Sequence, residues 1–188
     1  MKRFILTGTP GSGKTSILNA LHSHGYAVVH EAATDLICEE QSKGNERPWR
    51  DPLFLEKITE LQRFRQLQPA AAGAEVQFYD RSPVCTLALA RYLGHPVPAD
   101  LTSEIERIVR ERVYEPAVFF VRPLGFCRPT AARRITYQES LVFERYHEDE
   151  YRRLGFELAE VPAGAVEERA SLVESFIASR SARDAPWL

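Results

Sequence analysis

The chain has 188 residues, of which 44% are hydrophobic and 27% charged, and its formal net charge at pH 7 is −2. These values are typical of an α/β domain with a well-formed core, and they exclude a strongly basic surface with a general affinity for nucleic acid. The sequence offers no apolar run long enough to insert into a membrane, and the short apolar stretch Met1–Leu6 is not a signal peptide. The widely spaced Cys38, Cys85 and Cys127 fit a reducing cytosol and give no zinc or disulfide pattern, so we expect a cytoplasmic protein.

The first candidate strand, Arg3–Thr7, leads into a glycine-rich loop and then a helix near Lys14–His24. The loop GTPGSGKT matches G-x-x-x-x-G-K-T, in which backbone N–H groups at a helix N-terminus point toward phosphate oxygens. Lys14 can reach the outer phosphates, and the Thr15 hydroxyl can bind Mg²⁺. Strand, loop and helix stand in the order that the motif needs, which favours a phosphate loop over an ordinary glycine-rich turn. The expected nucleotide-binding residues are Gly8, Thr9, Pro10, Gly11, Ser12, Gly13, Lys14, Thr15 and Ser16.

Strands and helices alternate along the rest of the chain, which predicts a mostly parallel five-stranded sheet with helices on both faces. The further candidate strands are Ala27–His30, Val76–Asp80, Ala117–Val121 and Glu157–Val161. The further candidate helices lie near Ala32–Ser42, Pro52–Pro69, Pro83–Leu93, Leu101–Val113, Gln138–Leu154 and Val166–Ser179. An apolar stripe on the third helix consists of Phe54, Ile58, Leu61 and Phe64. We therefore expect a single three-layer α/β domain of the P-loop NTPase type at residues 1–179, followed by a tail at 180–188.

Ligands of such a sheet bind at the carboxyl ends of its strands, so the residues that follow each strand are informative. Glu31 is either a surface acid at a helix start or the base that takes a proton from an acceptor hydroxyl, and its position favours the base. Asp80 is favoured as a Mg²⁺ ligand beside Thr15 over a helix-capping residue. Arg81 either binds a phosphate or braces Asp80, and both alternatives stay open. Arg122 ends the fourth strand and is expected to add a second arginine to this edge.

Two segments outside the strands are rich in arginine. Residues 122–136, RPLGFCRPTAARRIT, are predicted to be a lid that closes over the phosphates rather than an exposed basic loop, with Arg128 as a nucleotide contact. Residues 43–66 carry Trp49 and Arg50, together with further arginines at 47, 63 and 65. These side chains either form an acceptor pocket by stacking and anion pairing, or Trp49 caps the core and the arginines are solvated.

The sequence resembles a known family, the small P-loop "AAA domain" proteins grouped with the nicotinamide-riboside kinase domain of NadR. The likeness runs over almost the whole length and includes TGTPGSGKTSIL, GYAVVHEAATDLI, RPWRDP, FYDRS and YRRLGFELAEVPAGAVEERASLV. The phosphate loop is shared by many families, whereas HEAA, PWRDP and ELAEVP are more specific.

The resemblance implies a nucleoside-kinase-like fold that uses ATP with Mg²⁺ and has a lid after the fourth strand. The site residues it implies are Glu31 near the acceptor, the pair Asp80 and Arg81, the lid arginines Arg133 and Arg134, and the adenine-side loop of Pro162, Ala163 and Gly164. Related kinases often carry an acid shortly before the lid arginine, whereas this chain has Thr130-Ala131-Ala132.

Taken together, the residues predict a kinase that transfers the γ-phosphate of ATP, or of GTP, to a hydroxyl of a small nucleoside-like metabolite. The predicted catalytic residues are Lys14, Glu31, Asp80, Arg133 and Arg134; the substrate-binding residues are Glu31, Trp49, Arg50 and Arg81; the metal ligands are Thr15 and Asp80. A motor ATPase of the larger AAA+ type is disfavoured because the chain is too short for its extra helical domain and no second acid follows Asp80. The alternative is a regulatory nucleotide-binding module that hydrolyses slowly and has no small-molecule acceptor.

The lid arginines should act on the transition state more than on nucleotide binding, because a phosphate-clamping arginine neutralises charge that develops during transfer. One of the two variants Arg133→Ala and Arg134→Ala, the one that removes the phosphate-clamping arginine, should lower kcat by roughly a thousandfold in an assay of ADP release. Equal activity of the wild type, both single variants and the double variant would remove the lid from the mechanism.

Overall fold

The structure is a computed structural model that describes residues 1–127 and 135–184. Five parallel strands form one sheet in the order β2-β3-β1-β4-β5. The strands are β1 (Lys2–Thr7), β2 (Ala27–Val29), β3 (Val76–Asp80), β4 (Ala117–Val121) and β5 (Glu157–Val161). The predicted α/β fold with a parallel five-stranded sheet is therefore confirmed.

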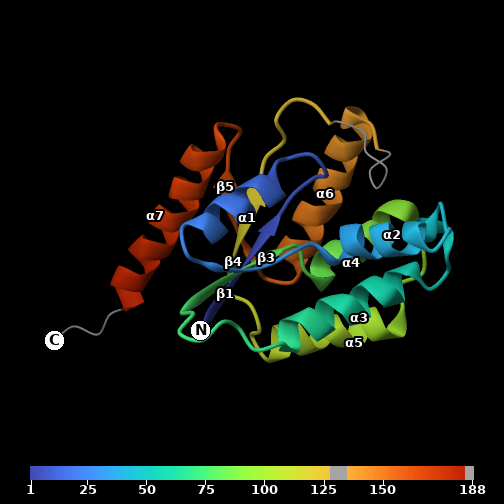
Figure 1. Cartoon of the computed structure of the whole chain (residues 1–188), viewed down its shortest axis with the longest axis horizontal. Coiled ribbons are helices and arrows are strands. Elements are labelled where there is room, and N and C mark those ends of the chain that lie inside the picture. Colours follow the sequence, from blue (N-terminus) through green and yellow to red (C-terminus); the bar gives the residue numbers. More distant parts are fainter. Residues whose placement is uncertain (128–134, 185–188) are drawn as a thin grey trace.

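Helices cover both faces of this sheet (Figure 1). Their bounds are α1 (Lys14–Ser23), α2 (Ala32–Ser42), α3 (Phe54–Leu67), α4 (Pro83–Leu93), α5 (Ala99–Arg110), α6 (Tyr137–Arg153) and α7 (Val166–Asp184), with a short 3-10 helix, η1 (Pro48–Arg50), before α3. Helices α1 and α7 pack on one face, and α4, α5 and α6 pack on the other. Among the described residues, no helix is both long and apolar enough to span a bilayer.

The period of two along each strand divides the core between the two faces. On β1, Phe4 and Leu6 point into the cluster beneath α1 and α7, whereas Ile5 points into the cluster beneath α4, α5 and α6. Strand β4 is buried on both faces, as expected for an inner strand of a parallel sheet. A third, smaller cluster joins α2 to α3 and forms one side of the region beside the sheet's carboxyl edge.

Two expectations from the sequence differ from the structure. Phe64 does not join the core, and its side chain is 59% exposed. At about 100° per residue, Phe64 lies roughly 80° around the axis of α3 from Phe54, which places it at the margin of the stripe that packs against the core. Helix α7 ends at Asp184, so it extends into the segment expected to be a tail. Ser82 caps α4, since its hydroxyl accepts a hydrogen bond from the Val84 backbone N–H at 3.2 Å.

The aromatic centre of the sheet should dominate stability. Phe119 is fully buried, and its ring packs against Phe4, Phe78 and Phe176 at centroid distances of 5.6, 6.3 and 5.2 Å. Phe119→Ala should lower the free energy of unfolding by about 3–5 kcal/mol, because it removes buried apolar surface and leaves a cavity. Phe64→Ala on the exposed side of α3 is the matched control and should change it by less than about 0.5 kcal/mol. Urea unfolding followed by circular dichroism measures both, and similar losses in the two variants would contradict this account of the core.

Candidate active site

The loop between β1 and α1 adopts a conformation that depends on glycine. Gly8 has φ of +129°, and a Cβ atom there would lie 2.3 Å from the Val121 carbonyl oxygen of β4. Gly13 has φ of +88° and precedes α1, and no described side chain caps this helix. The first N–H groups of α1 and the loop therefore remain available to an anion at the positive end of the helix dipole.

Lys14 lies within the curve of this loop and is almost completely buried. Its Nζ donates hydrogen bonds to the Thr9 carbonyl at 2.7 Å and to the Ser12 hydroxyl at 3.3 Å. Burial, and then the charge of Arg81, lower the pKa of Lys14 to about 7, against the attraction of Asp80 and Glu31. Loop oxygens thus occupy positions around the ammonium that phosphate oxygens can take, and an anionic ligand would favour its charged form.

Thr15 and Asp80 form the second polar element beside the loop. The Thr15 hydroxyl donates to Asp80 Oδ2 at 2.7 Å. The other carboxylate oxygen of Asp80, Oδ1, is buried and accepts no hydrogen bond from the residues that the structure describes. Burial raises the pKa of Asp80 above its ordinary value, although Lys14 and Arg81 attract the charged form. A hydroxyl and an unsatisfied carboxylate oxygen beside a phosphate loop fit the oxygen ligands that Mg²⁺ prefers.

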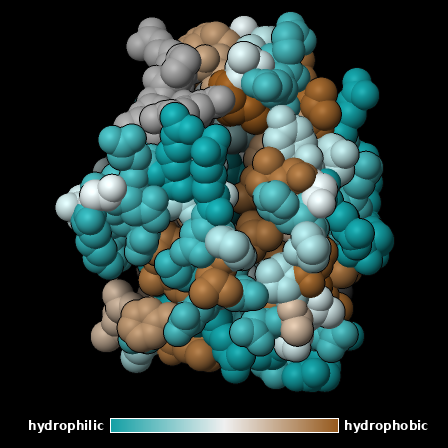
Figure 2. Space-filling model, turned by 90° about the vertical axis from the view of Figure 1, so that its right-hand side faces the viewer, coloured by the Kyte–Doolittle hydropathy of each residue, from teal (hydrophilic) through white to brown (hydrophobic). Residues whose placement is uncertain are grey.

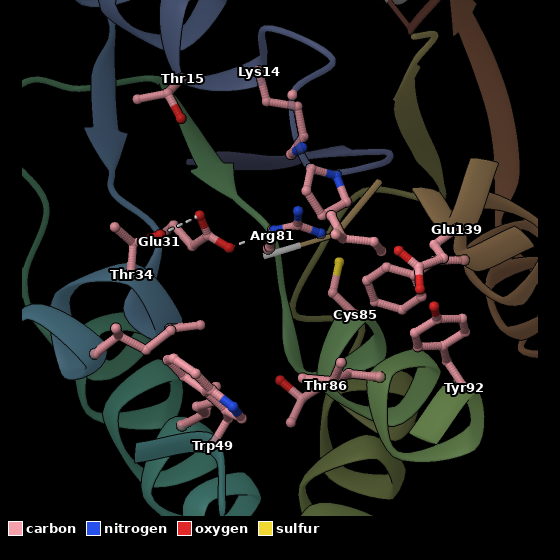
Figure 3. A pocket seen from close by; sticks show the side chains of 18 of the residues that line it. Lys14, Thr15, Glu31, Thr34, Trp49, Arg81, Cys85, Thr86, Tyr92 and Glu139 are labelled. Carbon is pink, nitrogen blue, oxygen red and sulfur yellow. Dashed lines mark hydrogen bonds and ion pairs between the residues drawn. The ribbon is translucent and has the colours of Figure 1, made fainter. Parts of the chain in front are cut away.

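Glu31 and Arg81 form an ion pair at the ends of β2 and β3. Arg81 Nε lies 2.6 Å from Glu31 Oε1, and the Thr34 hydroxyl donates to Glu31 Oε2 at 2.8 Å. Burial alone would raise the pKa of Glu31, but the charges of Arg81 and Lys14 and the Thr34 hydrogen bond together lower it. Glu31 is therefore a carboxylate at neutral pH. Figure 3 shows this pair between Lys14 on one side and the side chains of Trp49 and Thr86 on the other.

Lys14, Thr15, Glu31 and Arg81 line one cavity of about 670 Å³. The phosphate loop and Lys14 form one end, and the other end is lined by apolar and aromatic side chains from α2, η1, α3 and α4, namely Ile37, Trp49, Phe54, Ile58, Leu89 and Tyr92. Polar side chains in the wall include Thr34, Gln62 and Thr86. Figure 2 shows a hollow on this side of the molecule, with apolar side chains visible between hydrophilic rims. A cavity of this size and lining is typical of a small-molecule site.

The structure brings most of the residues expected at the site together. Lys14, Thr15, Glu31, Trp49 and Arg81 all line the cavity. Asp80 lies behind it, buried and bonded to Thr15 rather than open to the cavity. Trp49 lines the cavity and also packs against the α2–α3 cluster, so its position is compatible with both alternatives left open by the sequence. Its role in acceptor binding stays a prediction.

Arg122 requires a correction. It stands at the end of β4, as the sequence indicates, but its guanidinium binds Glu144 at 2.7 Å, Glu160 at 2.7 Å, and Glu148. It also lies over the Phe120 ring at 4.5 Å. Three carboxylates surround this one cation, so Arg122 joins β4 to β5 and α6 and supplies no positive charge to the cavity.

Other predicted residues lie apart from the cavity or outside the described chain. Arg50 is exposed on η1, and two neighbouring arginines form ion pairs with carboxylates elsewhere: Arg65 with Asp35 at 2.7 Å and Arg63 with Glu104 at 3.7 Å. The loop Pro162–Gly164 is exposed between β5 and α7. Arg128, Arg133 and Arg134 lie outside the described residues. Their roles in binding and catalysis stay predictions.

No motif in the sequence marks Arg169 as part of the site. This buried arginine of α7 donates from Nη1 to the Ser12 carbonyl at 2.8 Å and from Nη2 to the Arg122 carbonyl at 3.0 Å. It therefore fixes the position of the Ser12 carbonyl within the phosphate loop. The only local signal was a charged residue beside Ala170 in the apolar stripe of α7.

Comparison with known proteins supports the fold and the loop. A family model described as "AAA domain" matches residues 3–169. No curated protein matches the chain.

Several solved structures have a similar fold. Deoxyadenosine kinase from M. mycoides with bound dATP is 16% identical, with a TM-score of 0.53 over 94% of this chain and 99% of that chain. The same enzyme with bound dCTP gives 15% identity and a TM-score of 0.62 over 95% and 100% of the two chains. The NadR protein in complex with NAD and AMP-PNP is 14% identical, with a TM-score of 0.66 over 94% of this chain and 49% of that chain. At these identities the likeness establishes the fold, not the substrate.

Lys14→Ala should weaken the binding of Mg²⁺·ATP by about tenfold to a hundredfold, because it removes charge-assisted hydrogen bonds to phosphate oxygens. Isothermal titration calorimetry measures the affinity, and circular dichroism checks that the variant is folded. Lys43→Ala is the matched control, because it removes a lysine from an exposed ion pair at the C-terminal end of α2. This variant should bind Mg²⁺·ATP with the affinity of the wild type. A folded Lys14→Ala variant with unchanged affinity would show that the loop does not hold phosphate.

Proposed function

We propose that this chain, which belongs to the AAA domain family, is a phosphotransferase that uses ATP and Mg²⁺. The acceptor is a hydroxyl group of a small nucleoside-like metabolite. The observation that carries the proposal is the ionised Glu31, held by Arg81 between Lys14 and the apolar end of one cavity. A carboxylate at that position lies where an acceptor hydroxyl must approach a phosphate held by the loop.

The donor side of the reaction follows from the phosphate loop. Its N–H groups and Lys14 hold the β- and γ-phosphates, and Thr15 and Asp80 hold Mg²⁺. When bound, Mg²⁺ neutralises charge on the phosphate oxygens. Solved structures of similar fold contain dATP or AMP-PNP, which supports a nucleoside triphosphate as the donor.

The acceptor side depends on Glu31. As the acceptor oxygen forms its bond to the γ-phosphorus and the bond to the ADP oxygen breaks, the hydroxyl proton passes to the Glu31 carboxylate. The lowered pKa of Glu31 keeps this group ionised at neutral pH, so that the proton can pass to it as the new oxygen–phosphorus bond forms. Thr34 and Arg81 hold its two oxygens, which fixes the direction in which the carboxylate faces. In this role Arg81 orients Glu31 and adds positive charge near the transferred group.

The wall of the cavity favours a flat, partly apolar acceptor. Trp49, Phe54 and Tyr92 offer aromatic surface, and Gln62 and Thr86 offer hydrogen-bonding groups between them. A nucleoside combines these needs, since its ring can stack while its sugar carries hydroxyl groups toward Glu31. A regulatory module with no acceptor would have no need of the aromatic end of this cavity, which lies away from the phosphate loop.

Glu31→Gln tests the proposal because it keeps the size of the side chain and removes the base. The variant should bind Mg²⁺·ATP as tightly as the wild type and lose roughly a hundred- to ten-thousandfold of acceptor phosphorylation. The assay follows transfer of radiolabelled γ-phosphate to a panel of ribonucleosides and deoxyribonucleosides. Glu39→Gln, on the exposed side of the same helix α2, is the matched control.

Two outcomes would contradict the assignment. If no compound in the panel raises the wild-type turnover of ATP, the chain is better described as a regulatory nucleotide-binding module. If an acceptor is found and Glu31→Gln phosphorylates it at the wild-type rate, Glu31 is not the base.

A further inference from the structure

Helix α6 places an imidazole beside the Glu31–Arg81 pair. His147 is fully buried, and its two ring nitrogens contact different groups: Nδ1 lies 2.9 Å from the Phe143 carbonyl oxygen, and Nε2 lies 3.1 Å from Arg81 Nη1. A carbonyl oxygen can only accept a hydrogen bond, and a guanidinium can only donate one. Nδ1 therefore carries the proton, and Nε2 accepts from Arg81. The geometry specifies one tautomer of a neutral ring.

The environment of His147 agrees with this neutral form. Burial, and then the charges of Arg81 and Lys14, lower the pKa of His147 well below its ordinary value, although the Phe143 carbonyl opposes the shift. A protonated ring would place an N–H group against the N–H groups of Arg81. The ring also packs against Phe143 at a centroid distance of 4.3 Å. A buried imidazole is costly unless it is hydrogen-bonded, and both of its nitrogens are.

Arg81 has a strained backbone, so its side-chain contacts, including the one with His147, must hold it in place. Its φ is +74°, in the left-handed region that non-glycine residues seldom adopt. Its side chain is held in three directions: Nε pairs with Glu31, and Nη1 donates to the Gly8 carbonyl at 3.2 Å and to His147. Gly8 and Glu31 belong to the site itself, whereas His147 comes from α6 and shares Arg81 Nη1 with the Gly8 carbonyl.

We propose that His147 is a positioning residue, which accepts a hydrogen bond from Arg81 and thereby holds the guanidinium plane in the orientation that pairs it with Glu31. The proposal rests on the proposed function, since it concerns the geometry of the same reaction. It assigns α6 a part in catalysis without any contact of its own with the reacting atoms. Without His147, Arg81 keeps its charge but loses one of the contacts that fix its plane.

Another buried side chain of α6, Tyr151, provides a matched control. The Tyr151 hydroxyl lies one helical turn from His147 and is 2.8 Å from Ser82 Oγ and 3.2 Å from Cys85 Sγ. It is as buried as His147 and joins α6 to the start of α4, next to Arg81 in the sequence, but it does not touch Arg81 in these contacts. Tyr151→Phe therefore removes a buried hydrogen bond of α6 and leaves the contact with Arg81 in place.

The first test compares His147→Leu, His147→Gln and Tyr151→Phe with the wild type, using ATP and whichever nucleoside of the panel is phosphorylated. His147→Leu should lower kcat by about tenfold to a hundredfold with little change in the KM for ATP. His147→Gln should recover most of this loss, because its amide oxygen can accept from Arg81 near the position of Nε2. Tyr151→Phe should lower thermal stability but not kcat. Equal loss of kcat in His147→Leu and Tyr151→Phe, or no rescue by glutamine, would reduce His147 to a packing residue.

The second test does not depend on activity. Nitrogen-15 NMR of the histidine rings should find His147 neutral, with the proton on Nδ1, between pH 6 and pH 8; a charged ring or a proton on Nε2 would overturn the proposal. The Nε–H signal of Arg81 should exchange slowly in the wild type and in His147→Gln, and faster in His147→Leu. If the wild type phosphorylates no acceptor, the proposed function fails by itself. The Arg81 signal then decides the positioning role, and an unchanged signal in His147→Leu rejects it.

Discussion

The buried guanidinium of Arg81 is the interaction on which the geometry of the site depends. A buried charge without partners is strongly destabilising, so the groups around it must be placed where they satisfy it. Its partners come from three parts of the chain: the Gly8 carbonyl of the phosphate loop, Glu31 at the end of β2 and His147 of α6. One side chain therefore aligns the donor loop, the candidate base and a helix from the opposite side of the sheet. The left-handed backbone of Arg81 is maintained because these contacts together outweigh its strain.

The site combines two basic side chains, Lys14 and Arg81, with two acidic ones, Glu31 and Asp80. Burial lowers the pKa of Lys14 to about 7 and raises the pKa of Asp80, whereas Arg81 is a cation and Glu31 a carboxylate at neutral pH. A bound triphosphate alone would give this cluster a large excess of negative charge in a region of low dielectric constant. A divalent cation that enters with the phosphates would offset that excess, which is the physical basis for our proposal that the free oxygen of Asp80 binds a cation together with the nucleotide.

Local patterns in the sequence were sufficient for the fold and for part of the site. The bounds predicted for β3, β4 and β5 agree with the structure. A strand can be recognised from its own residues and from the turn residues that flank it, so no information from distant parts of the chain is needed. The residues at strand ends were also placed well, since parallel strands present their carboxyl ends at one edge. The position of Arg122 at a strand end led to the wrong expectation that its charge belongs to the site. Its carboxylate partners lie on α6 and β5, and no pattern near Arg122 in the sequence indicates them. His147 and Arg169 were missed for the same reason: their partners are 66 and 157 residues away.

The bond between Arg169 and the Ser12 carbonyl has a consequence for how the protein acquires its site during synthesis. The loop at residues 8–15 leaves the ribosome well before α7, which begins only at Val166. Until α7 docks beside α1, the Ser12 carbonyl of the loop lacks its cationic partner and β1 lacks much of the apolar cover on that face. At about 5–20 residues per second, synthesis of the residues between the loop and α7 takes about 8–30 seconds, during which Arg169 cannot support the loop. Nucleotide should therefore bind only after α7 has docked, and its binding would then stabilise the docked helix.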